Sequence, residues 1–262
     1  SASLSTSRYD PAGGGGTQTA AFITGGAPPP GAGMTTTEEY NGSGWNSGGA
    51  LGTGRYMGAG CGTLTAGLVA GGYINPSPTL EQSVVEEYDG SSWTEVGDLS
   101  SGRYMFRSLM GVQTAAVASN GMVHPGGPIN ALTPAATVEE YNGSSWTTGG
   151  PRGTAVASSV ECGTSTAGMS ISGVTAAPGT PKTVDVKYYD GSSWTAAPSV
   201  NTARREAGGA GSQTAAIFFA GDPDPGNNTN ATEIYDGTSW TTSPATMGTA
   251  NAGVGFSSNT TS

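Results

Sequence analysis

The stretch Glu38-Glu39-Tyr40-Asn41-Gly42-Ser43-Gly44-Trp45 decides the fold, because close copies of it recur along the chain. The copies occupy residues 86–93, 139–146, 187–194 and 233–240, and their tryptophans are 48, 53, 48 and 46 residues apart. A period in this range is typical of the blades of a β-propeller. We therefore predict that the recurring tyrosines and tryptophans are structural anchors between blades: Tyr40, Trp45, Tyr88, Trp93, Tyr141, Trp146, Tyr189, Trp194, Tyr235 and Trp240.

A second motif keeps the same period. It reads Thr-Ala-Ala or Thr-Ala-Gly and begins at Thr19, Thr65, Thr114, Thr166 and Thr214. In the last unit the pattern predicts a first strand over 207–211, a second over 214–220, a third that ends at Tyr235 and a fourth that begins at Trp240. The Asp-Gly and Asn-Gly pairs before each Trp favour tight hairpins. The sequence thus predicts an all-β, five-bladed propeller with four short antiparallel strands per blade.

The repeats divide one predicted domain, residues 1–262, into five units. They span approximately 8–54, 55–102, 103–151, 152–203 and 204–249, and residues 250–262 begin another unit. This last segment is either a partial repeat or a strand that closes the ring by completing the first blade. Five blades are favoured over six, because five Tyr-to-Trp units are present.

Composition excludes some partners. The formal charge is −10, and Lys182 and Lys187 are the two lysines of the chain. Because the chain lacks the clustered basic residues that bind the phosphate backbone, nucleic-acid binding is not expected. No apolar stretch approaches the roughly 20 residues that span a bilayer, so no membrane insertion is expected.

The chain resembles the kelch family. The resemblance rests on an arginine near the start of each unit, a Gly-Gly pair after the second strand at 25–26 and 71–72, a Tyr-Asp pair and then a Trp. Asn120-Gly121, Ser172-Gly173 and Ala220-Gly221 replace the glycine pair in later units, which predicts different strand ends there. The repeat motifs, such as Tyr-Asp/Asn-Gly-Ser-Ser-Trp-Thr, also resemble those of structural proteins of marine bacteriophage virions, which form a tail fibre or a capsid appendage. The recurring arginines are Arg8, Arg55, Arg103, Arg152 and Arg204.

No catalytic or metal site is predicted. Some kelch-fold proteins are copper oxidases, whose site requires two histidines, whereas this chain has His124 alone. Cys61 and Cys162 hold equivalent positions in non-adjacent units, so two free, buried thiols are expected. The Asp222, Asp224 and Asn227 oxygens could ligate calcium, but their spacing is not that of an EF-hand. We expect no cofactor, no metal and no enzymatic activity.

Carboxylates recur together with the arginines. They stand two residues before the Tyr, and Lys187 interrupts the series in the fourth unit. A group that is present in nearly every blade predicts structural ion pairs between blades rather than a glycosidase site. The four carboxylates are Glu38, Glu86, Glu139 and Glu233.

Recognition is predicted in the connections between the second and third strands. These connections, at 27–37, 73–83, 120–137, 174–183 and 222–231, vary between units whereas the tight turns do not. Function on a rigid scaffold is concentrated in such loops. The candidate contact residues are Tyr73, Ile74, His124, Ile129, Asn130, Asp222, Asp224 and Asn227.

These observations lead to a functional hypothesis. The chain is predicted to be a non-catalytic virion appendage, decoration or receptor-binding propeller, at a virion surface or outside the cell. Its expected partners are a host-surface glycan or protein and other virion proteins. The alternative is a secreted or intracellular kelch scaffold that binds a partner protein.

Overall fold

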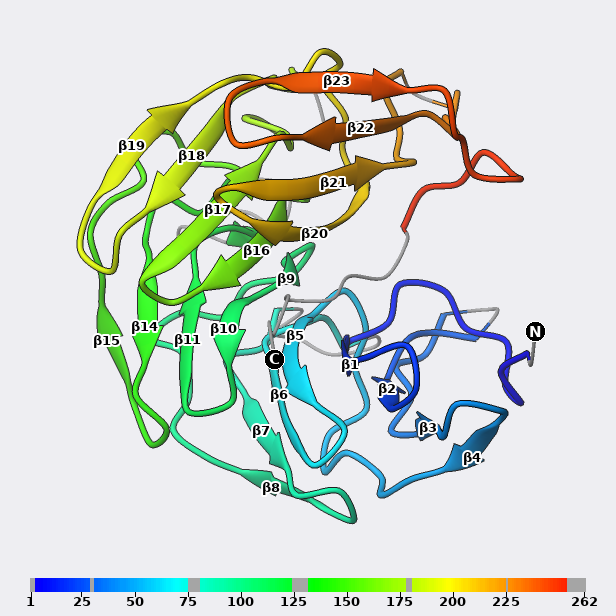
Figure 1. Cartoon of the computed structure of the whole chain (residues 1–262). Helices are drawn as coiled ribbons and strands as arrows, with labels where there is room; N and C mark the ends of the chain where they lie inside the picture. Colours follow the sequence, from blue (N-terminus) through cyan, green and yellow to red (C-terminus); the bar gives the residue numbers. More distant parts are fainter. Residues whose placement is uncertain are drawn as a thin grey trace.

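The computed structural model describes residues 3–28, 31–74, 81–123, 132–177, 181–224 and 226–253. All regular structure in this part of the chain is β-strand. Five sheets, each with four antiparallel strands in chain order, are arranged as the blades of a propeller (Figure 1). The predicted fold class is therefore confirmed. The described residues contain no helix that is long and apolar enough to cross a membrane.

The strands follow the repeats. Blade one comprises β1 (Gly13–Gly16), β2 (Ala21–Thr24), β3 (Thr37–Tyr40) and β4 (Trp45–Ser47). Blade two comprises β5 (Ala59–Thr63), β6 (Ala66–Ala70), β7 (Val85–Tyr88) and β8 (Trp93–Glu95), and β9 (Arg107–Ser108) joins its inner edge in parallel. Blade three comprises β10 (Met110–Val112), β11 (Ala115–Ala118), β14 (Glu139–Tyr141) and β15 (Trp146–Thr148), with the hairpin of β12 (Met122–Val123) and β13 (Thr133–Pro134) beside it. Blade four comprises β16 (Val160–Thr164), β17 (Ala167–Ile171), β18 (Val186–Tyr189) and β19 (Trp194–Ala197). Blade five comprises β20 (Gly208–Ser212), β21 (Ala215–Phe219), β22 (Thr232–Tyr235) and β23 (Trp240–Ser243).

The innermost strands pack so closely that several positions have room for glycine alone. A Cβ on Gly60 of β5 would lie 2.7 Å from the backbone nitrogen of Gly14 in β1. Farther from the axis, side chains fill the wider space between blades, and separate apolar clusters join blades one and two, two and three, three and four, and four and five.

The recurring Tyr and Trp residues pair with each other inside each blade. Each Tyr is the direct cross-strand partner of its Trp, for example Tyr88 opposite Trp93, whose ring centroids are 4.7 Å apart. Between them the Asp89 carboxylate accepts hydrogen bonds from the backbone N–H groups of Ser91 and Ser92, and Gly90 takes a positive φ of 93°. The hairpin between the third and fourth strands is therefore fixed by the Asp-Gly sequence.

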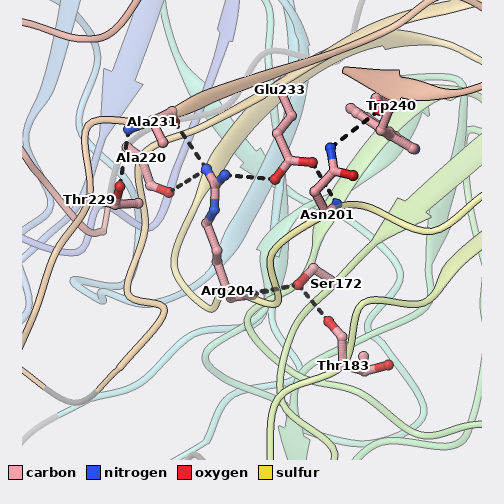
Figure 2. Close-up of polar contacts among 9 residues, drawn as sticks. All are labelled: Ser172, Thr183, Asn201, Arg204, Ala220, Thr229, Ala231, Glu233 and Trp240. Atoms are coloured by element: carbon pink, nitrogen blue, oxygen red, sulfur yellow. Dashed lines mark hydrogen bonds and ion pairs between the residues drawn. The ribbon is translucent and has the colours of Figure 1, made fainter. Parts of the chain in front are cut away.

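The recurring arginines and glutamates form buried ion pairs inside four of the five repeats, which corrects the expectation of pairing between blades. In repeat five, Arg204 Nη2 lies 2.7 Å from Glu233 Oε1, and Arg204 Nη1 donates to the carbonyls of Ala220 and Ala231 (Figure 2). Glu233 Oε2 accepts the backbone N–H of Asn201, in the connection from blade four. The pair thus ties that connection to the third strand. Equivalent pairs are Arg8–Glu38, Arg55–Glu86 and Arg103–Glu139.

Repeat four replaces this pair with a different buried network. Lys187 stands where the other repeats have glutamate, and Arg152 Nε donates to Ser170 Oγ. Ser170 Oγ in turn donates to Glu161 Oε1, which also accepts Asn120 Nδ2, both at 2.8 Å. Complete burial raises the pKa of Glu161, against the opposing effect of Arg152.

Two sequence expectations about small residues have different outcomes. Asn120 of repeat three does not share the positive φ of Gly71, as predicted, but Ser172 and Ala220 both adopt a φ of 59°, close to the 64° of Gly71, so the predicted change is wrong in repeats four and five. The backbone keeps its left-handed turn there despite the steric cost of a side chain. The expectation for Cys61 and Cys162 is confirmed, because both are free and buried.

Candidate binding site

The site lies at the end of the propeller that carries the connections from second to third strands, called here the loop face. At this end the residue after each repeat arginine, or its counterpart in repeat four, pairs with a residue three or four positions after the end of the second strand. These isolated bridges are Tyr9 with Ala27, Tyr56 with Tyr73, Tyr104 with Met122, Ala157 with Val174, and Arg205 with Asp222. The bridges anchor the root of each variable connection beside the axis.

Backbone hydrogen bonds then run from blade to blade around the axis. Met57 N–H donates to the Asp10 carbonyl at 3.0 Å, and Ser158 N–H donates to the Met105 carbonyl at 3.0 Å. Glu206 N–H continues the series to the Ser158 carbonyl at 3.2 Å. All of these residues have positive φ. The strained conformations therefore cluster where the blades converge, which fixes the positions of the adjoining side chains.

Four tyrosines form a continuous row on this face. The Tyr9 and Tyr56 ring centroids are 6.3 Å apart, those of Tyr56 and Tyr73 are 5.1 Å apart, and those of Tyr73 and Tyr104 are 5.4 Å apart. Tyr9 is 43% exposed, whereas Tyr56 and Tyr104 are mostly buried. The row extends over the first three blades, and Met57 and Met105 pack beside it.

Burial controls the chemistry of these phenols. It raises the pKa of Tyr56 to about 12, with smaller contributions from Tyr73, Tyr9 and Asp10. Burial likewise raises the pKa of Tyr104 to about 12. A phenol with its ordinary pKa near 10 is already protonated at physiological pH, so the raised pKa values keep both hydroxyls protonated over a wider alkaline range.

Next to the tyrosine row, the Arg107 side chain forms ion pairs with carboxylates of two other blades. Arg107 Nη1 lies 2.6 Å from Asp10 Oδ1 of blade one, and Arg107 Nη2 lies 3.5 Å from Glu206 Oε1 of blade five. The arginine is 4% exposed, and the two carboxylates are 17% and 21% exposed. One buried cation thus holds two partly exposed acceptors at the centre of the loop face.

On the side of blade five the face is polar. Arg205 Nε lies 2.7 Å from Asp222 Oδ2, and Asp222 is buried. The Asp224 carbonyl accepts the N–H of Asn227 at 2.9 Å, which closes a short turn in the same connection. Asp222 therefore orients Arg205 and the loop root rather than pointing freely to solvent. Among the described residues, no three His, Cys, Asp or Glu side chains form a metal-binding group.

The predicted contact residues are only partly placed. Tyr73 lies within the tyrosine row and Ile74 follows it, half-buried. His124, Ile129 and Asn130 lie outside the described residues. The sequence analysis missed Tyr9, Tyr56 and Tyr104. The signal was an Arg-Tyr pair that opens each of the first three repeats.

The described residues define a five-bladed β-propeller, a fold that is consistent with a binding scaffold. The structural comparison finds 174 matching chains among solved structures. One of them, from the structure of YjhT, superimposes with a TM-score of 0.74 at 13% identity, over 94% of this chain and 86% of that one. At this identity the likeness concerns the fold. No family model and no curated protein sequence matches the chain.

The match to YjhT overturns the expectation that the chain is not an enzyme. That expectation rested on the lack of a local catalytic motif in the sequence. In a propeller, however, side chains from several blades converge at the axis, as Asp10, Arg107 and Glu206 do here. A site of that kind has no sequence motif, so the exclusion of catalysis is withdrawn.

Proposed function

We propose that the protein is a binding propeller that recognises a glycan through the tyrosine row of its loop face. The observation that carries the proposal is the unbroken contact from Tyr9 through Tyr56 and Tyr73 to Tyr104. Binding sites typically combine apolar and aromatic surface with a few polar groups that fix orientation. The rings supply a platform for the apolar faces of sugars, and Asp10, Glu206 and the phenols supply the polar groups.

A carbohydrate fits this surface better than an anionic polymer does. The chain carries a net charge of −10, and Arg107 is already neutralised by carboxylates on both sides. A neutral or basic sugar can accept and donate hydrogen bonds there without electrostatic repulsion. Because tyrosine has few rotatable bonds, ordering the row costs little conformational entropy on binding.

The setting of this activity is part of the same proposal. We place the protein at a virion surface or outside the cell, where it binds a glycan of the host surface. Kelch membership and this setting are proposed from the low charge density and from the Tyr-Asp/Asn-Gly pattern followed by Trp that recurs in the repeats. A protein receptor on the host is the competing ligand class, and the experiment below separates the two.

The test is binding of labelled protein to a glycan array and to a panel of bacterial cells. Tyr73→Ser and Tyr9→Ser are each expected to weaken glycan binding at least 10-fold. The matched control is Val112→Ser, because Val112 is 37% exposed and lies at the β10–β11 turn on the opposite face. Equal binding by all three variants, or binding to cells that is unaffected by removal of their surface glycans, would refute the proposal.

A further inference from the structure

Each blade presents an aliphatic or aromatic side chain to the next blade from its second strand. This position is almost completely buried in the first four blades, with 0–2% exposure, but it is 39% exposed in blade five. The neighbour that covers this position elsewhere is thus missing from the described residues next to blade five. The residues concerned are Phe22, Leu68, Val117, Met169 and, in blade five, Ile217.

The third strands make a regular contact between blades as well. The Tyr88 hydroxyl of blade two donates to Glu39 of blade one, and Tyr141 of blade three donates to Glu87 of blade two at 2.9 Å. The Tyr189 hydroxyl donates to Glu140, and Tyr235 contacts Tyr188 in the same way. The residue that contacts the tyrosine hydroxyl of the next blade is therefore polar in the first four blades. These residues are Glu39, Glu87, Glu140 and Tyr188.

Both ends of this series are open. In blade five the position of Glu39 is taken by Ile234, which is 47% exposed. In blade one the Tyr40 hydroxyl donates to the Gly42 carbonyl of its own turn at 3.0 Å. Tyr40 is half-buried, whereas its four counterparts are buried. Blade five and blade one thus lack the contact that joins every other neighbouring pair.

Glutamines at the turn between the first and second strands give the same result. Gln113 Nε2 donates to the Gly67 and Tyr88 carbonyls of the preceding blade, both at 3.0 Å. Gln213 does the same to the Gly168 and Tyr189 carbonyls. Gln18 has this position in blade one, but it is exposed and has no side-chain partner in the described part of the chain. Its two acceptors would belong to a blade that precedes blade one around the ring.

The chain after blade five already takes the first positions of such a blade. The Asn251 carbonyl accepts the Gly221 N–H at 2.8 Å, as the Arg204 carbonyl accepts the Gly173 N–H. Gly253 N–H then donates to the Glu206 carbonyl at 2.9 Å and extends the axial series. A Cβ on Gly253 would lie 3.2 Å from Asp10 Oδ1. In Figure 1 this segment runs from the outside of blade five toward the centre.

We infer that the exposed sides of blade five and blade one form the seat of a sixth blade of the same repeat, in which residues 251–253 take the first positions. The contacts specify its chemistry. It offers two backbone carbonyls to Gln18 and a carboxylate or another acceptor to Tyr40. Against Ile234 it places an apolar ring in the position of the usual Tyr, because Ile234 cannot accept a hydrogen bond. In this arrangement blades one, three and five alternate around the axis, which accounts for the reach of Arg107 to Asp10 and Glu206.

The test adds a sixth repeat to the full chain and follows the accessibility of the seat. A second copy of residues 207–253 is inserted between residues 253 and 254, so that the rest of the chain is kept. The substitutions Ile234→Glu and Tyr235→Phe are made in the inserted copy alone. The reporter is Ile217→Cys in the original blade five, and its rate of reaction with a maleimide is measured. The native Cys61 and Cys162 are buried and serve as an unreactive background.

The Ile217→Cys thiol is expected to react rapidly in the 262-residue chain and at least 10-fold more slowly in the extended chain. The matched control, Val112→Cys, is similarly exposed but lies outside the seat, and it reacts equally in both. A second extension, built in the same way from repeat three, guards against a single copy that fails to fold. Equal reactivity of the Ile217→Cys thiol in both extensions and in the parent chain overturns the proposal. Protection that already exists in the parent chain together with a dimer in sedimentation also overturns it, because a second copy would then occupy the seat.

Discussion

Glu86→Gln tests the buried ion pairs that stabilise four of the five repeats. The substitution keeps the shape of the side chain and an acceptor for the Gly52 N–H, but it removes the charge that lies 2.7 Å from Arg55 Nη1. The two side chains are 0% and 2% exposed, so Arg55 becomes a buried cation without its counter-ion. Breaking a buried pair in this way costs about 3–5 kcal/mol. That is a large share of a stability of about 5–15 kcal/mol, and it lowers Tm by about 6–20 °C.

The assay is urea and thermal unfolding followed by circular dichroism. Lys187→Gln is the matched control, because Lys187 occupies the same repeat position without this pair, and its expected effect is within about 0.5 kcal/mol. The double variant Arg55→Met with Glu86→Leu is expected to be more stable than Glu86→Gln, since no unpaired charge remains. A loss below about 1 kcal/mol for Glu86→Gln, typical of an exposed pair, would refute the reasoning.

Three further outcomes are expected. Gln113→Ala removes two hydrogen bonds between blades and lowers the free energy of unfolding by about 1–3 kcal/mol, whereas Gln18→Ala leaves it unchanged in the 262-residue chain; equal effects would contradict the open seat. Because burial raises the pKa of Glu161 in the folded state, its favourable contribution is complete below its ordinary pKa of about 4.5 and is lost as the pH rises through the higher folded value. The difference in stability between Glu161→Gln and the parent is therefore expected to shift in favour of the variant from pH 4 to pH 7 in urea titrations, and a constant difference would disprove it. Burial also raises the pKa of the Cys61 and Cys162 thiols, so Ellman's reagent is expected to detect neither in the folded protein and both in denaturant; modification without unfolding would contradict their burial.

The repeat architecture could be predicted from sequence because each blade reuses the same local chemistry. Tyr88, Gly90 and Trp93 fix a hairpin through contacts between residues close in the chain, and the same spacing announces it in every unit. The candidate site is different, because it depends on contacts between blades. The contact of Arg107 with Asp10 spans 97 positions of the sequence and joins repeat three to repeat one. Nothing in the periodic pattern encodes that contact.

The same limit applies to the tyrosine row and to the repeat-four network. Tyr56 and Tyr73 belong to different segments of one repeat and meet because a β-bridge joins them at the axis. Glu161 replaces the missing ion pair of repeat four from another strand, so its role cannot be read from the position that Lys187 occupies. Local motifs therefore predicted the blades, while the arrangement of the blades determined the site.

The most direct test of the account is a crystal structure of the protein with the best ligand from the glycan array. We expect a sugar ring to lie against the exposed part of the tyrosine row at Tyr9 and Tyr73, with a hydroxyl group within hydrogen-bonding distance of Asp10 or Glu206. A sugar bound at the hairpin turns of the opposite face, near residues 89–92 or 142–145, would contradict recognition through the loop face. A crystal saturated with ligand in which no sugar binds the protein would contradict glycan recognition altogether.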